Sequence, residues 1–167
     1  TISQLFFLMM QGLSFAVSIL VSNAFGRKDF KSVREYSRKG YFMTLGISAT
    51  LSVLLYCFRY QAAGVFSDSP EVTAMAVSLF FLLFAYQFGD GLQLCFANVL
   101  RGIQDVKPIM YAAFISYYLI AIPSAYLLGF KASLGLQGIW MGFPIGLTLA
   151  GVFFYARYRA DLRRLSR

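Results

Sequence analysis

The sequence contains no histidine, and only seven of its 167 residues are acidic. Transition-metal sites draw on histidine, cysteine or clustered carboxylates, so this composition leaves no ligand set for one. Catalysis inside a membrane needs a histidine, a paired carboxylate or a nucleophile with a base, and the sequence offers no such combination. The two cysteines, Cys57 and Cys95, lie in or beside apolar segments and are expected to be unpaired. We therefore expect no enzyme, no cofactor and no transition metal.

Charged residues are scarce as a whole, at 13% of the chain against 59% hydrophobic residues. That balance cannot cover a water-facing surface, and the apolar residues form several long blocks rather than one anchor or signal segment. The blocks lack the short alternating pattern of a membrane β-barrel. We expect an all-α membrane protein, a polytopic bundle of five transmembrane helices in a lipid bilayer. The predicted spans are residues 2–25, 41–58, 71–100, 108–130 and 133–156.

Basic residues follow alternate connections between these spans. Thirteen of the fifteen lysines and arginines lie in the segment 26–40, in the link after residue 100 and in the tail 157–167. By the positive-inside rule these connections are cytoplasmic, which places the first residue outside and the C-terminus in the cytoplasm. The net charge of +8 then needs no nucleic-acid partner. Residues 26–40 are expected to form a short interfacial helix.

The chain begins inside an apolar run and without methionine. We therefore expect it to be the C-terminal portion of a longer membrane protein, whose N-terminal half is absent from this sequence.

Glycines and prolines in the last two spans predict close packing and kinks. Gly138, Gly142 and Gly146 recur every fourth residue, and such a strip lets another helix approach closely. Pro144 lies among them. Pro123 removes a backbone hydrogen bond within its span and is expected to kink it.

Asp90 is the one charged residue in the interior of the predicted spans, since Glu71 lies at the very start of its span. Asp90 lies about 15 Å along the helix from the cytoplasmic end, and a carboxylate at that depth costs at least about 2.5 kcal/mol. Tyr86, Gln87 and Gln93 project from the same side of the helix and offer further polar atoms. Because burial disfavours the ionised form, Asp90 is positioned to exchange a proton or to bind a cation such as Na⁺. A structural role, with Asp90 hydrogen-bonded by a neighbouring helix, is the alternative.

The first span carries a polar stripe that includes Gln11, Ser14 and Ser18. Residues at this spacing share one helical face. Two interpretations stay open: hydrogen bonds across a tight helix interface, or the lining of a wet cavity.

Three segments resemble one known family: SNAFGRKDFKSVREYSRKG, FAYQFGDGLQLCFANVLRGIQDVKP and YYLIAIPSAYLLGFKASLGLQGIWMGFPIG. They are similar, in order and spacing, to the C-terminal half of the multidrug and toxic compound extrusion (MATE) family. The resemblance covers all 167 residues and includes the Leu100-Arg101-Gly102 turn. It implies a twelve-helix antiporter of two six-helix bundles, of which this chain matches helices eight to twelve.

The resemblance also implies roles for particular residues. Asp90 matches the acidic residue of the C-terminal cation site, and Tyr86 matches a tyrosine beside it. The partner acid of the family lies on helix seven, which this sequence does not contain.

The function implied is export of amphipathic drugs or toxic organic compounds, coupled to Na⁺ or H⁺ influx across the plasma membrane, in bacteria the inner membrane. A flippase for lipid-linked oligosaccharides is one alternative, although an anionic pyrophosphate cavity would need intramembrane lysine or arginine, which the predicted spans lack. A non-transporting membrane scaffold is another, and it leaves Asp90 and the polar stripe unexplained.

Overall fold

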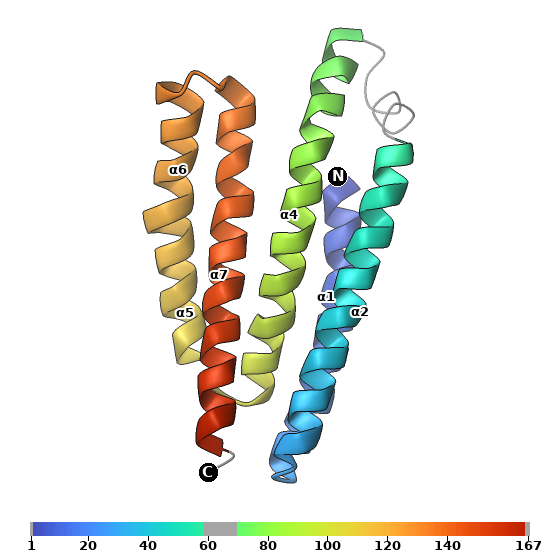
Figure 1. The fold of residues 1–167 in the computed structure, drawn as a ribbon, viewed down its shortest axis with the longest axis vertical. Coiled ribbons are helices and arrows are strands. Elements are labelled where there is room, and N and C mark those ends of the chain that lie inside the picture. Colours follow the sequence, from blue (N-terminus) through green and yellow to red (C-terminus); the bar gives the residue numbers. More distant parts are fainter. Residues whose placement is uncertain (1, 59–69, 166–167) are drawn as a thin grey trace.

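The computed structural model describes residues 2–58 and 70–165, and their regular structure is entirely helical, as the composition predicts. Five helical rods lie side by side along the long axis of the molecule (Figure 1). The connection between the second and third rods, residues 59–69, lies outside the described residues. The rods are α1 (Ile2–Gly26), α2 (Phe30–Cys57), α4 (Pro70–Gly102), one rod made of α5 (Lys107–Phe114), η1 (Ile115–Ala121), α6 (Ile122–Tyr126) and η2 (Leu127–Lys131), and α7 (Gly135–Leu165).

Three helical stretches of the described residues are long and apolar enough to cross a membrane: Phe7–Gly26, Lys107–Lys131 and Gly135–Arg164. In α2 and α4 some side chains lie outside the described residues, although the sequence of each contains a long stretch without charge, residues 40–57 and 72–89. That these two rods also span the bilayer stays a prediction.

The basic segment 26–40 differs from its expected form. Residues 30–40 are not a separate interfacial helix but the first three turns of α2, which continues without a break through Gly40. A side chain at Gly40 would meet Val17 of α1, so this glycine brings the two helices together instead of ending one. The basic tail is likewise helical as far as Leu165, as the end of α7.

Two tight turns connect helices at the basic end. Before α2, the backbone N–H of Ser32 donates to Asp29 Oδ1 at 3.1 Å and caps the helix. After α4, the N–H of Asp105 donates to the carbonyl of Leu100 at 2.9 Å, with Gln104 at a φ of +64°. Both arrangements satisfy backbone groups that a helix end leaves unpaired. Short turns therefore connect α1 to α2 and α4 to α5 at the same end of the bundle (Figure 1).

The rod from residue 107 to 131 is π-helical before and after the short α6, which contains Pro123. Proline lacks an N–H and its ring crowds the carbonyl four residues earlier. The chain responds with the π-helical segment η1 directly before α6, where the N–H of Ile122 donates to the carbonyl of Tyr117, five residues back. A second π segment, η2, ends the rod at Lys131. Such wide turns bend helices.

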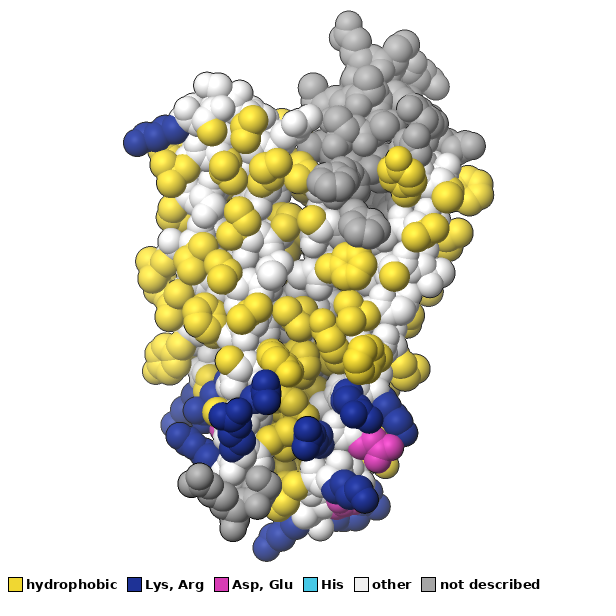
Figure 2. All heavy atoms as spheres, in the orientation of Figure 1, with side chains coloured by type: hydrophobic (Ala, Val, Ile, Leu, Met, Phe, Trp, Pro, Cys, Tyr) yellow, Lys and Arg dark blue, Asp and Glu magenta, His cyan; other side chains and the backbone are white. Residues whose placement is uncertain are grey.

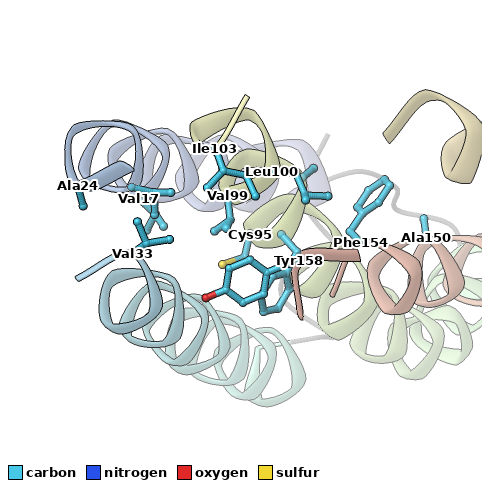
Figure 3. Packing of buried hydrophobic residues seen from close by; sticks show 13 residues of the cluster. Val17, Ala24, Val33, Cys95, Val99, Leu100, Ile103, Ala150, Phe154 and Tyr158 are labelled. Atoms are coloured by element: carbon cyan, nitrogen blue, oxygen red, sulfur yellow. The ribbon is translucent and has the colours of Figure 1, made fainter. Parts of the chain in front are cut away.

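The core lies where α1, α2, α4 and α7 meet, and Figure 3 shows the packing of its side chains. It consists of small and branched side chains with a few large aromatics. Cys95 is buried within it, whereas Cys57 is exposed, and both thiols are free. The labelled members in Figure 3 are Val17, Ala24, Val33, Cys95, Val99, Leu100, Ile103, Ala150, Phe154 and Tyr158.

Candidate functional site

Asp90 lies on α4 between two glycines, and its side chain is only 2% exposed. On one side, Gly89 faces α7. A Cβ placed on Gly89 would lie 2.7 Å from Thr148 Oγ1 and 3.2 Å from the Thr148 backbone nitrogen. The absence of a side chain at Gly89 therefore lets α7 pack directly against α4 beside the carboxylate.

On the other side, Gly91 faces α1 and α2. A Cβ placed there would lie 3.2 Å from both Ser48 Oγ and Thr44 Cγ2 of α2, and 3.5 Å from Met10 Cε of α1. Ser48 donates to the sulfur of Met10 at 3.2 Å, so α1 and α2 are also joined at this level. The two glycines thus let α1, α2 and α7 pack closely against α4 on either side of the Asp90 position.

Several buried polar atoms gather on and near this part of α4. Tyr86 lies one turn before Asp90, half-buried, and close enough for its hydroxyl to interact electrostatically with the carboxylate. Tyr117 of η1 is a second tyrosine within such range. Buried polar groups are normally hydrogen-bonded, yet several atoms here have no partner among the described residues. These atoms are Asp90 Oδ2, both amide atoms of Gln87, Gln93 Oε1 and Ser116 Oγ.

The polar stripe of α1 is only partly turned inward. Ser14 is fully buried, and its Oγ has no hydrogen-bond partner in the described part of the chain. Gln11 and Ser18 are half-buried. The carbonyl of Ser18 lies against Gly102, twelve residues along α4 from Asp90 and so about 18 Å away by helical rise. The structure therefore does not place Ser18 beside the carboxylate.

The glycine strip of α7 lies against the rod 107–131. A Cβ added at Gly142 or Gly146 would lie 2.6 Å from the Cβ of an alanine in that rod, and one at Gly138 would collide with its backbone. Pro144 lies half-buried within α7 between two of these glycines. These positions fix how closely the last two rods approach each other.

Tyr117 and Ser116 lie near Asp90 although no sequence pattern marks them as site residues. They lie more than 25 positions from Asp90 in an uncharged run, and no spacing connects them to it. Gly146 brings them near α7, since its added Cβ would lie 3.3 Å from the Ser116 carbonyl oxygen and 3.5 Å from Tyr117 Cδ1. Only the packing reveals these two residues.

A second polar cluster, also missed, lies at the basic end, beyond the predicted span 133–156. Arg157 Nε donates to Asp105 Oδ2 at 2.6 Å, and Arg157 Nη2 lies 3.2 Å from Asp161 Oδ1. Burial, reinforced by the neighbouring Asp105 carboxylate, raises the pKa of Asp161 to about 6. The available signal was the spacing of Arg157 and Asp161, four residues apart on one helix.

Comparison with known proteins provides the family. The MatE family model matches residues 1–127. The chain is 35% identical over 159 residues to the multidrug resistance protein NorM of Aliivibrio fischeri, covering 93% of this chain and 35% of that protein. It is 32% identical over 166 residues to a probable multidrug resistance protein NorM of Bacillus subtilis, covering 98% of this chain and 36% of that protein. The chain thus spans about a third of the length of these curated relatives.

Solved structures share the fold. A crystal structure of a eukaryotic MATE transporter matches 98% of this chain with a TM-score of 0.88 and 23% identity, over 38% of its own length. An inward-facing multidrug resistance MATE family transporter matches 99% of this chain with a TM-score of 0.89 and 17% identity, also over 38% of its length. Together with the match to the family model, these findings show that the chain belongs to the MATE family, a family of multi-pass membrane transporters and not of enzymes.

Proposed function

We propose that this chain is part of a secondary active transporter that exports amphipathic drugs or toxic organic compounds in exchange for Na⁺ or H⁺. The observation that carries the proposal is the burial of Asp90, at 2% exposure, where α1, α2 and α7 close around α4. A carboxylate in this position is costly unless it is protonated or bound to a cation. The coupling ion is the only small ligand that we propose besides the exported compound; no cofactor is required.

The surroundings of Asp90 suit either ion. Na⁺ binds oxygen ligands, and the side chains of Tyr86, Gln87, Gln93 and Tyr117 carry oxygens within this part of the bundle. A proton would instead neutralise the carboxylate directly. Gln11 and Ser14 are proposed as polar wall residues on α1, with Ser18 nearer the basic end.

Exchange follows if the coupling ion and the exported compound favour different conformations of the protein. A ligand shifts a conformational equilibrium only by its difference in affinity for the two states. We propose that Asp90 binds its ion in the state that releases the organic compound, with the distortion around Pro123 and the packing at Pro144 available for the rearrangement. The relatives named multidrug resistance proteins support the class of exported compound.

The natural setting is a bacterial inner membrane, with the basic end of Figure 2 on the cytoplasmic side and the beginning of the chain outside. Because the chain covers about a third of its curated relatives, transport is proposed for the longer protein of which this chain forms the C-terminal part. The remaining part of that protein would supply the second acid of the ion site.

The test compares Asp90→Asn with Asp161→Asn in the naturally expressed protein, assayed by dye efflux in membrane vesicles. Na⁺ and pH gradients are imposed separately, and insertion is verified by quantifying protein in the membrane. Loss of a charge-assisted interaction of about 1.5–3 kcal/mol predicts a decrease of about tenfold or more in gradient-driven efflux for Asp90→Asn. Asp161→Asn removes the same charge at the basic end and should retain most of the activity.

Two results would overturn the proposal. Unchanged gradient-driven efflux in Asp90→Asn would make Asp90 a structural residue. Equal losses in both variants would show that efflux responds to any buried aspartate. The gradient that drives the wild-type protein identifies the coupling ion.

A further inference from the structure

A groove of about 920 Å³ lies between α2 and α7 at the basic end. Its rim carries five exposed basic side chains: Lys31, Arg34 and Arg38 from α2, and Arg159 and Arg163 from α7. Figure 2 shows basic side chains on both sides of a hydrophobic strip at this end of the molecule. None of these five residues belongs to the site around Asp90.

The floor of the groove is aromatic and apolar. Phe96 of α4 is part of this floor, and its ring centroid lies 4.9 Å from that of Tyr155 and 5.4 Å from that of Tyr158, both of α7. Leu92 extends the floor along α4, and Phe42 extends one wall along α2. The guanidinium of Arg159 lies 5.9 Å from the centre of the Tyr155 ring, at the boundary between floor and rim.

The groove changes character along its length. It extends on α2 from Phe30 to Phe42, twelve residues or about 18 Å by helical rise. Its basic side chains lie in the segment 26–40 and in the tail after residue 156, whereas Phe42 lies in the predicted span 41–58. With the span 41–58 crossing the bilayer as predicted, one end of the groove lies at the level of the lipid headgroups and the other reaches the acyl chains.

No acidic residue in the described part of the chain lines this groove. The carboxylates nearest in sequence have partners outside the lining: Asp29 accepts from Ser32, Glu35 lies 2.6 Å from Lys39, and Asp105 and Asp161 both face Arg157. The described lining thus contains five basic side chains and no acidic one, and this net positive charge would attract an anionic group.

We propose that this groove binds one anionic phospholipid from the leaflet at the basic end. The arginines of the rim contact the phosphate, which matches their planar donor geometry, and an acyl chain lies along the floor formed by Leu92, Phe96 and Tyr155. Basic pockets between membrane helices on the cytoplasmic side suit such headgroups. A soluble phosphate would leave the apolar floor exposed to water, so the lipid is the occupant that satisfies both parts of the groove.

The test measures lipid retention by native mass spectrometry of the naturally expressed protein. Phosphatidylglycerol and phosphatidylcholine with identical acyl chains are titrated, with inorganic phosphate as a soluble competitor. The groove variant is Arg34→Gln/Arg38→Gln. The control variant, Arg27→Gln/Lys28→Gln, removes the same charge from the same region but from exposed residues that do not line the groove.

The wild-type protein should retain phosphatidylglycerol preferentially. Because the groove variant removes two charges that would contact the headgroup, it should lower this preference about tenfold or more. The control variant should change the preference less than about twofold. Phosphate should not displace the lipid. Equal losses in both variants, or no preference in the wild type, would overturn the proposal in favour of diffuse surface charge. Displacement by phosphate would overturn it in favour of a soluble anion.

A second measurement keeps every rim charge and so remains available if the double variant fails to fold. Phe42→Trp in a Trp140→Phe background places the only tryptophan of this chain beside the groove, and Phe114→Trp in the same background places it on α5 outside the lining. Brominated phosphatidylglycerol at low mole fraction should quench the Phe42→Trp variant more than the Phe114→Trp variant, and the excess should vanish with brominated phosphatidylcholine. Equal quenching of the two variants contradicts a bound lipid.

Discussion

Asp90 and Asp161 are both buried aspartates, at 2% and 8% exposure, but among the described residues only Asp161 has a cation beside it. Arg157 bridges Asp161 and Asp105 at the end of the bundle, where basic residues are abundant. Around Asp90 the described residues offer glycines, tyrosines, glutamines and hydroxyls, all neutral. The fold thus provides a counter-charge for Asp161, at the basic end, and none among the described residues for Asp90. This difference favours a structural role for Asp161 and supports the ion-binding role proposed for Asp90.

The largest effect on stability is expected at Gly89, which allows α7 to reach Asp90. Gly89→Ala places a methyl group 2.7 Å from Thr148 Oγ1 and 3.2 Å from its backbone nitrogen, so the helices must separate. Overpacking of this kind should lower the free energy of unfolding by about 2 kcal/mol. Denaturant unfolding measures this loss, and the Tm should fall with it.

The matched control is Gly46→Ala on α2, where no atom of the described residues lies within 4 Å of the added Cβ. Alanine favours helix by up to about 1 kcal/mol over glycine, so this variant should be neutral or more stable. If Gly89→Ala is as stable as Gly46→Ala, the close packing around Asp90 contributes nothing, and the contrast with the basic end weakens.

Arg157→Gln is expected to have the next largest effect. It leaves Asp105 and Asp161 facing each other without their shared cation. Charge-assisted hydrogen bonds contribute about 1.5–3 kcal/mol when buried, but Arg157 is 34% exposed, and screening by water reduces the expected loss to about 1 kcal/mol. Hydrogen exchange of the backbone amides at 103–106 should rise as this turn loosens.

The double variant Arg157→Gln/Asp161→Asn isolates the cause. Because it removes one of the two facing carboxylates, it should recover most of the lost protection. Failure to recover would mean that Arg157 acts through packing alone and that its pairing with the carboxylates has little structural value.

The smallest effect is expected for Asp161→Asn, and it depends on pH. The pKa of Asp161 is raised from its ordinary value of 3.8 to about 6, so its contribution to stability is complete below pH 4 and is lost as the pH rises through 6. Asparagine does not titrate. The Tm of the variant relative to wild type should therefore increase between about pH 4 and 7 and stay constant above that range.

A Tm difference that does not change across this pH range would contradict the expected sign. It would mean that Asp161 titrates alike in the folded and unfolded protein, and that burial beside Asp105 does not affect its ionisation.

Much of the architecture was predictable because it depends on local properties of the chain. Long runs without charge predict membrane-spanning helices. Asp90 interrupts one of them, and burying its carboxylate costs free energy wherever that helix packs. The short interfacial helix predicted within residues 26–40 is instead the first part of α2, which continues through Gly40, where it packs against Val17 of α1.

The sequence by itself determined that this is a helical membrane protein. It also determined which connections carry the basic residues and which carboxylate is isolated in an apolar span. Only the tertiary structure decided what surrounds that carboxylate, which arginine pairs with which aspartate and where α2 and α7 leave a groove. The physical reason is range: helix formation and membrane partitioning depend on neighbouring residues, whereas Arg157 and Asp105, 52 positions apart, meet only when the helices pack.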